Sequence, residues 1–185
     1  MNLLYPTFKL SILPWMLCVA VLGALVGGAY GVLHDQVTYS ISPEYFTKLK
    51  FNQFHYANFG FPNRIFVSEV GFLATWWVGF LSAWFLARIA FPAWPMRLAF
   101  QRCLIGFLII FVSGFTAAAL GYLLGFLHSP DYSNWLDLCE TIGVVDVPHF
   151  VRVAYIHNAS YIGGLIGLLC AIFYLLRLRN RRTAG

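Results

Sequence analysis

The sequence predicts an all-α integral membrane protein, built as a bundle of four transmembrane helices. Of its 185 residues, 60% are hydrophobic and only 10% are charged, a balance far outside that of soluble domains. Four apolar segments are each long enough to cross the hydrocarbon core of a bilayer, which takes about 20 residues of helix. They leave little room for a soluble module, so we expect a single membrane domain over residues 1–185.

The expected elements follow the order of the apolar runs. The four predicted helices span about residues 12–33, 65–86, 103–127 and 153–176. They are joined by an outer loop (34–64), an inner loop (87–102) and a second outer loop (128–152), and a basic inner tail (177–185) follows. The first run also fits a cleaved signal peptide, because Lys9 precedes it and small residues end it. Its length favours a retained helix.

The distribution of charge predicts the orientation. Lysine and arginine are enriched in loops that stay in the cytoplasm. The segment before the first helix, the loop 87–102 and the tail 177–185 contain basic residues and no Asp or Glu. The other two loops together hold six of the chain's seven acidic residues and four basic ones. We therefore expect both termini in the cytoplasm, with the chain in a bacterial inner membrane. The net charge of +5 then reports topology, and we expect lipid as a partner and no nucleic acid.

Small residues recur at four-residue spacing in every predicted helix, a pattern that lets helix backbones approach closely in lipid. This repetition predicts that the four helices pack into a compact bundle. The rows are Gly23, Gly27 and Gly31; Gly71, Thr75, Gly79, Ala83 and Ala87; Ser113, Ala117, Gly121 and Gly125; and Gly163, Gly167 and Ala171, beside Ser160 and Gly164.

The first outer loop contains a helix start, Ser42-Pro43-Glu44, with an N-cap hydroxyl and a proline in the first turn. We expect a short helix through "PEYFTKLKFNQF", whose interleaved aromatic and basic residues are typical of a segment lying in the membrane interface. One interpretation is a lid over the outer mouth of the bundle. The other is a simple anchoring connector.

Three histidines are expected at similar depth near the outer boundary: His34, His128 and His157. At about 100° per residue, each lies within roughly 20° of the small-residue row of its own helix. The three imidazoles are therefore predicted to point into the outer end of the bundle. Two acids are further candidates: Asp131 follows His128 by one turn, and Glu69 lies a turn into the second helix, although it faces away from that helix's small residues.

Ionisable groups within a membrane span are costly and commonly functional. His34, His128 and His157, with Glu69 or Asp131, form a candidate site for one transition-metal ion, since imidazole and carboxylate are standard ligands. Alternatively, two of the histidines could ligate a haem iron. In the third interpretation the side chains only make hydrogen bonds to their surroundings.

The sequence leaves two hypotheses for function. The first is a non-catalytic membrane component or accessory subunit that packs with lipid, with another membrane protein or with a second copy of itself. The second is a metal- or haem-binding, redox-type membrane protein that uses the outer histidines. The hydrolase, phosphate-loop and dinucleotide motifs do not occur in the chain, and whether it is an enzyme stays open.

Overall fold

The computed structural model describes residues 8–127 and 132–183, and within these ranges the chain is helical and contains no strand. Its four long helices are each long and apolar enough to span a membrane. The all-helical class and the four predicted spans are therefore confirmed. The helices are α1 (Leu13–Ile41), α3 (Asn63–Ala90), α4 (Met96–Leu127) and α6 (Val147–Thr183).

The long helices extend beyond the predicted spans. The largest extension that bears on the site is in α1, which runs about two turns past residue 33. It ends at Ile41 because Ser42 precedes a proline and takes an extended conformation. The hydroxyl of Ser42 then accepts a hydrogen bond from the backbone N–H of Tyr45 at 3.4 Å, which starts the next helical segment.

Shorter helices lie between the long ones. The segment after Ser42 forms a π-helical turn, η2 (Tyr45–Lys50), which continues into the single turn α2 (Phe51–Gln53) and the 3-10 turn η3 (His55–Ala57). A further 3-10 turn, η1 (Leu10–Ile12), precedes α1. The sequence did not predict α5 (Ser133–Ile142), which ends at Gly143 in the left-handed conformation that favours glycine.

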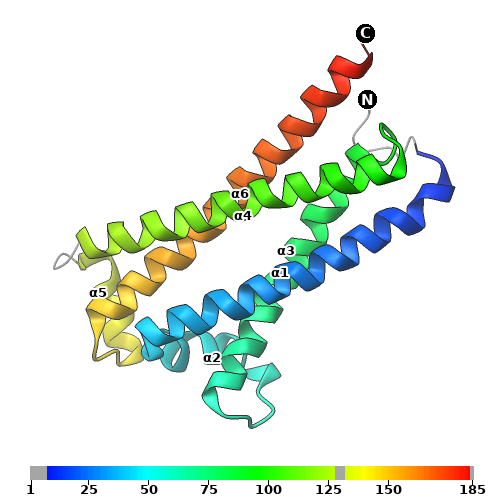
Figure 1. Cartoon of the computed structure of the whole chain (residues 1–185). Coiled ribbons are helices and arrows are strands. Elements are labelled where there is room, and N and C mark those ends of the chain that lie inside the picture. Colours follow the sequence, from blue (N-terminus) through cyan, green and yellow to red (C-terminus); the bar gives the residue numbers. More distant parts are fainter. Residues whose placement is uncertain (1–7, 128–131, 184–185) are drawn as a thin grey trace.

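The closest packing is between α1 and α3 and between α4 and α6, which form two crossing helix pairs (Figure 1). In the first pair, a Cβ atom on Gly31 would clash with the carbonyl oxygen of Gly71, and one on Gly71 would clash with Gly31. In the second pair, Gly163 packs against Ser113 and Ala117. The predicted small-residue rows therefore form the contacts within each pair.

The two pairs meet through separate hydrophobic clusters. One includes Met16, Leu86, Cys103 and Leu175, near the start of α1 and the end of α6. The other joins η2 to the start of α6 and includes Tyr45, Phe46, Val67, Phe150 and Val151. The start of α1 and the end of α6 lie at one end of the molecule, while α2 and α5 lie at the other (Figure 1). This second end corresponds to the predicted outer side.

Candidate metal centre

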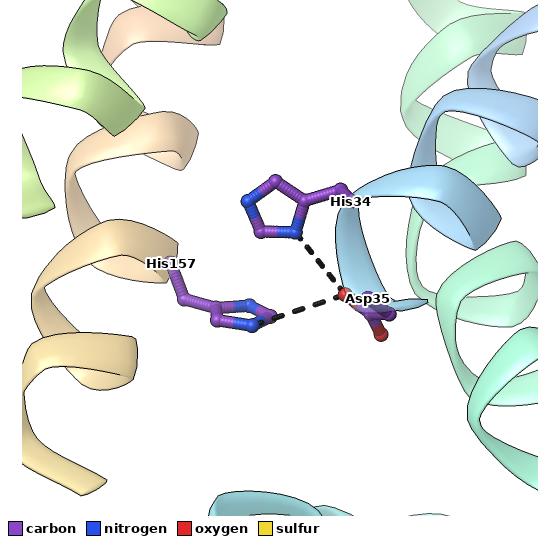
Figure 2. A group of neighbouring side chains, drawn as sticks. All are labelled: His34, Asp35 and His157. Carbon is purple, nitrogen blue, oxygen red and sulfur yellow. Dashed lines mark hydrogen bonds and ion pairs between the residues drawn. The ribbon is translucent and has the colours of Figure 1, made fainter. Parts of the chain in front are cut away.

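The extension of α1 carries polar side chains toward α6 near the predicted outer end. His34 and Asp35 project from α1 and His157 projects from α6, so that the three meet between the helices (Figure 2). His34 Nδ1 lies 3.2 Å from Asp35 Oδ1, and His157 Nε2 lies 3.8 Å from the same oxygen. One potential ligand atom from each residue lies within 4.8 Å of the others. We call these three residues the His-Asp-His cluster.

The cluster is enclosed by protein. The exposed fraction is 10% for the side chain of His34, 6% for Asp35 and 2% for His157. Tyr45 from η2 stacks on the His157 ring with a centroid distance of 4.9 Å, and the Tyr30 ring lies 5.6 Å from that of His34. Aromatic side chains therefore separate the cluster from its surroundings.

The segment that covers the cluster is tied to the start of α6 by Glu44. Its carboxylate accepts hydrogen bonds from the backbone N–H groups of Val145, at 3.1 Å, and Asp146, at 2.7 Å. Such charge-assisted bonds are stronger than neutral ones. This contact fixes the loop after α1 against the helix that carries His157, and so holds Tyr45 over the imidazole.

Burial and the charge of Asp35 shift the pKa values of two residues on the covering segment, Tyr45 and Lys50. Burial, followed by the charges of Tyr161 and Asp35, raises the pKa of the Tyr45 hydroxyl, which keeps it neutral. Burial also lowers the pKa of Lys50, and the Asp35 carboxylate acts against this shift. Asp35 therefore contributes a negative potential that extends to η2.

Each imidazole uses one ring nitrogen within the cluster and leaves the other without a partner. His34 Nδ1 bonds Asp35, and His157 Nε2 lies 3.3 Å from the Thr38 hydroxyl. His34 Nε2 and His157 Nδ1 are buried and have no hydrogen-bond partner in the structure. A buried polar atom left unpaired costs about 1–3 kcal/mol. The hydrogen bonds among the described residues therefore leave one nitrogen of each imidazole uncompensated.

The structure brings together two of the predicted site residues, His34 and His157. The other predicted histidine, His128, and Asp131 lie outside the described residues. Glu69 does not belong to the His-Asp-His cluster; it lines an open pocket on α3. The carboxylate between the imidazoles comes instead from Asp35, which the sequence analysis had placed in a loop.

Asp35, Thr38 and Tyr45 are the site residues that the sequence analysis missed. The signal was the absence of any helix breaker between His34 and Ser42, since "HDQVTYSI" contains neither glycine nor proline. A helix that continues through this stretch puts Thr38 one turn after His34, on the same side. Hydropathy alone instead predicts that these polar residues begin the outer loop.

No protein-family model matches the chain, and neither the curated proteins nor the solved structures contain one with significant similarity to it.

Proposed function

We propose that this chain is an integral membrane protein that binds one divalent transition-metal ion between α1 and α6, using His34, Asp35 and His157. The observation that carries the proposal is the convergence of two imidazoles and one carboxylate, from two helices, in a buried site. Two histidines and one carboxylate form a set that binds zinc and non-haem iron in proteins. The proposal follows the metal-binding hypothesis of the sequence analysis.

The spacing of the ligand atoms fits an ion. Bonds of about 2.0–2.2 Å in tetrahedral geometry place two ligand atoms roughly 3.3–3.6 Å apart. The separations of 3.2 and 3.8 Å from Asp35 Oδ1 lie on either side of this range. The ligand atoms of all three residues lie within 4.8 Å of one another, so the two imidazoles would move closer together, by up to about 1 Å, to close the site around an ion.

The same geometry disfavours haem. An iron held between two imidazole nitrogens separates the ring centroids by roughly 6 Å, given bonds of about 2.0 Å. The centroids of His34 and His157 are 4.6 Å apart, and the rings meet edge to face. The Asp35 carboxylate also lies against both of them. A porphyrin has no space between these rings, so an ion is the better candidate.

Three protein ligands leave at least one coordination position for water or a substrate, as in catalytic metal sites. The ion would also join the two helix pairs, since α1 belongs to one and α6 to the other. We place the site in the outer part of a bacterial inner membrane, with both termini cytoplasmic, on the basis of the positive-inside distribution of charge.

The first hypothesis, a non-catalytic component without a bound ion, is favoured by a different observation. Thr38 Oγ1 lies 3.0 Å from the His34 carbonyl oxygen as well as 3.3 Å from His157 Nε2. Thr38 and Asp35 could thus hold the imidazoles through hydrogen bonds alone, and the cluster would only fix α1 against α6.

Metal content distinguishes these functions. The full chain, purified in detergent and stripped with a chelator, is titrated with Zn²⁺ or Co²⁺, and bound metal is measured by elemental analysis after desalting. We expect about one ion per chain for the wild type and a loss of at least about tenfold in affinity for His157→Ala, because an inner ligand is removed. Bound metal should also raise the melting temperature, since it binds only the folded state.

His55→Ala is the matched control, because His55 is an exposed histidine of η3 that bonds only the nearby Asn52 carbonyl. It should bind the ion as the wild type does. If His157→Ala does not fold, Asp35→Asn provides a variant of almost unchanged volume. The metal site would be refuted if the wild type bound no metal, or if the wild type and the His157→Ala, Asp35→Asn and His55→Ala variants all bound it equally. The cluster would then serve only to hold α1 against α6.

A further inference from the structure

Basic side chains gather at the end of the molecule away from the His-Asp-His cluster, where both termini lie (Figure 1). The start of α1, the turn between α3 and α4, and the end of α6 meet there in the hydrophobic cluster that includes Met16, Trp94 and Leu175. Residues 8–12, 86–102 and 175–183 of these segments contain no Asp or Glu. Their cations, which we call the basic end, are Lys9, Arg88, Arg97, Arg102, Arg177, Arg179, Arg181 and Arg182.

Contacts between these segments bring arginines from different helices onto one surface. The guanidinium of Arg182, in α6, donates to the carbonyl oxygen of Ala93, in the turn between α3 and α4. Arg102, in α4, donates to the Tyr174 hydroxyl of α6 at 3.1 Å and lies over the Trp94 ring. The end of α6 is therefore held beside the turn and beside the start of α4, which carries Arg97.

The protein does not balance the charge of the basic end. Over residues 8–127 and 132–183, Arg88, Arg97, Arg177 and Arg181 form no ion pair, and the ion pairs found there join histidine to aspartate. The C-terminal dipole of α6 supplies only about half of one negative charge. Because Arg97, Arg177 and Arg181 are exposed, an anion from outside the protein can reach their guanidinium groups.

The surroundings of the basic end favour an anionic lipid over a dissolved anion. The cations lie at the ends of helices that are apolar enough to span a membrane, so they are expected at the depth of the phospholipid headgroups. Exposed apolar side chains accompany them: Met96 precedes Arg97, and Phe173 lies one turn before Arg177. A phospholipid would contact the arginines with its phosphate and these apolar side chains with its acyl chains, whereas free phosphate would make only the polar contact.

We propose that the basic end binds phospholipids of net negative charge, such as phosphatidylglycerol, through arginines of α4 and α6. A guanidinium donates two parallel hydrogen bonds to a phosphate, which makes arginine well suited to this group. Phosphatidylethanolamine has the same phosphate, but its ammonium cancels the charge and it should bind more weakly. The proposal goes beyond the metal site and does not depend on it.

Retention of lipid by the purified chain tests the proposal. The full chain in detergent is incubated with equal amounts of phosphatidylglycerol and phosphatidylethanolamine of identical acyl chains and washed, and the retained lipids are quantified by mass spectrometry. We expect the wild type to retain phosphatidylglycerol at least roughly fivefold more, the ratio that one basic residue near an anionic headgroup gives. Arg97→Gln and Arg181→Gln should each lower this ratio, and the double variant should bring it close to one. Lys48→Gln removes an exposed cation of η2, at the other end, and should preserve it.

Equal retention of both lipids by the wild type would overturn the proposal. An equal loss of preference in Arg97→Gln and Lys48→Gln would also overturn it, because the net charge of the protein would then attract the lipid. Inorganic phosphate should displace no more phosphatidylglycerol than chloride does at the same ionic strength; a much larger displacement would assign the site to a dissolved anion. Melting temperatures establish that the variants fold, and their metal content should equal that of the wild type, which separates the basic end from the His-Asp-His cluster.

Discussion

At the residue scale, the site depends on how Asp35 lies between two histidines. His34 and His157 come from helices far apart in the sequence, and Asp35 Oδ1 is the atom that both approach. The carboxylate between the two imidazoles completes a set of three ligand atoms for a cation. Tyr45 closes the site by stacking on His157.

The stability of the folded protein is expected to depend on pH through Asp146, a residue outside the membrane spans. Asp146 precedes α6, and its carboxylate accepts bonds from the His149 ring nitrogen at 2.8 Å and from the His149 backbone N–H at 3.3 Å. Burial acts to raise the pKa of Asp146, but these hydrogen bonds and the charges of His149 and Arg152 outweigh it and lower the pKa. The ionised carboxylate therefore stabilises the start of α6.

The Asp146 carboxylate caps the start of α6 by accepting the His149 backbone N–H. Replacing Asp146 should therefore destabilise the protein only at pH values at which this carboxylate is ionised. Because the folded-state pKa is depressed, the contribution is present above the unfolded value of about 3.9 and is lost as the pH falls through the folded value. We expect Asp146→Ala to cost about 1 kcal/mol at pH 7, as a lost helix cap does, and the difference from wild type to shrink toward pH 3. Thermal unfolding at both values measures this.

Asp137→Ala, an exposed residue of α5, is the control and should leave the melting temperature unchanged at both pH values. A penalty for Asp146→Ala that is the same at pH 7 and pH 3 would contradict the account, because the effect would then not arise from the charge.

The sequence could predict two of the site's residues but not the third. Helical phase placed His34 and His157 toward the bundle because each points within roughly 20° of the small-residue row of its own helix. Asp35 was not predicted because the apolar run stops at residue 33, and the predicted helix was therefore ended there. A polar helical extension that is buried by another segment carries no hydropathy signal, since its burial is a tertiary property.

At the scale of elements, the glycine rows determine which helices pair. Phase predicted that small residues would pack helices together, and Gly23, Gly27 and Gly31 do pack against α3. It could not tell which helix each row contacts, because all four rows are chemically similar. It also could not show that Gly164 faces open space while Gly163, its neighbour, packs against α4.

This difference between glycines can be tested by adding one methyl group. Gly31→Ala should lower the melting temperature in detergent, because its Cβ would clash with the Gly71 carbonyl and the Thr75 hydroxyl, and overpacking of this kind costs about 1–3 kcal/mol. Gly164→Ala is the matched control: apart from the backbone of its own helix and its chain neighbours, no atom of the described residues lies within 4 Å of its added Cβ, and alanine favours helix.

We therefore expect Gly164→Ala to melt at or slightly above the wild-type temperature. If both variants melt alike, the close packing of α1 on α3 is wrong.

At the scale of the whole molecule, two tightly packed helix pairs are joined by contacts at their ends. A compact bundle of four helices was predicted, whereas the close packing in the structure is within two pairs, α1 with α3 and α4 with α6. The His-Asp-His cluster lies where α1 meets α6, beside the aromatic cluster of η2 and the start of α6. An ion bound there would act on the arrangement of the pairs as well as on its own ligands.

The overall class was predictable because a bilayer imposes length and composition on every helix that crosses it. The arrangement of the pairs was not, since the predicted loops 34–64, 87–102 and 128–152 are long enough to permit several orders of packing. Orientation in the membrane stays a prediction from charge. The convergence of His34 and His157 depends on how the two helix pairs are arranged. The sequence could therefore identify the two histidines as candidates but could not show that they meet.

X-ray absorption spectroscopy shows whether two imidazoles and one carboxylate hold the same ion. The full chain in detergent is loaded with one equivalent of Zn²⁺, and the fine structure is recorded for the wild type and for the His34→Ala and His157→Ala variants. We predict nitrogen and oxygen ligands at about 2.0–2.1 Å with the outer-shell scattering of two imidazoles, and one imidazole fewer in each variant. A spectrum of oxygen ligands alone, or imidazole scattering that persists unchanged in both variants, would contradict the account.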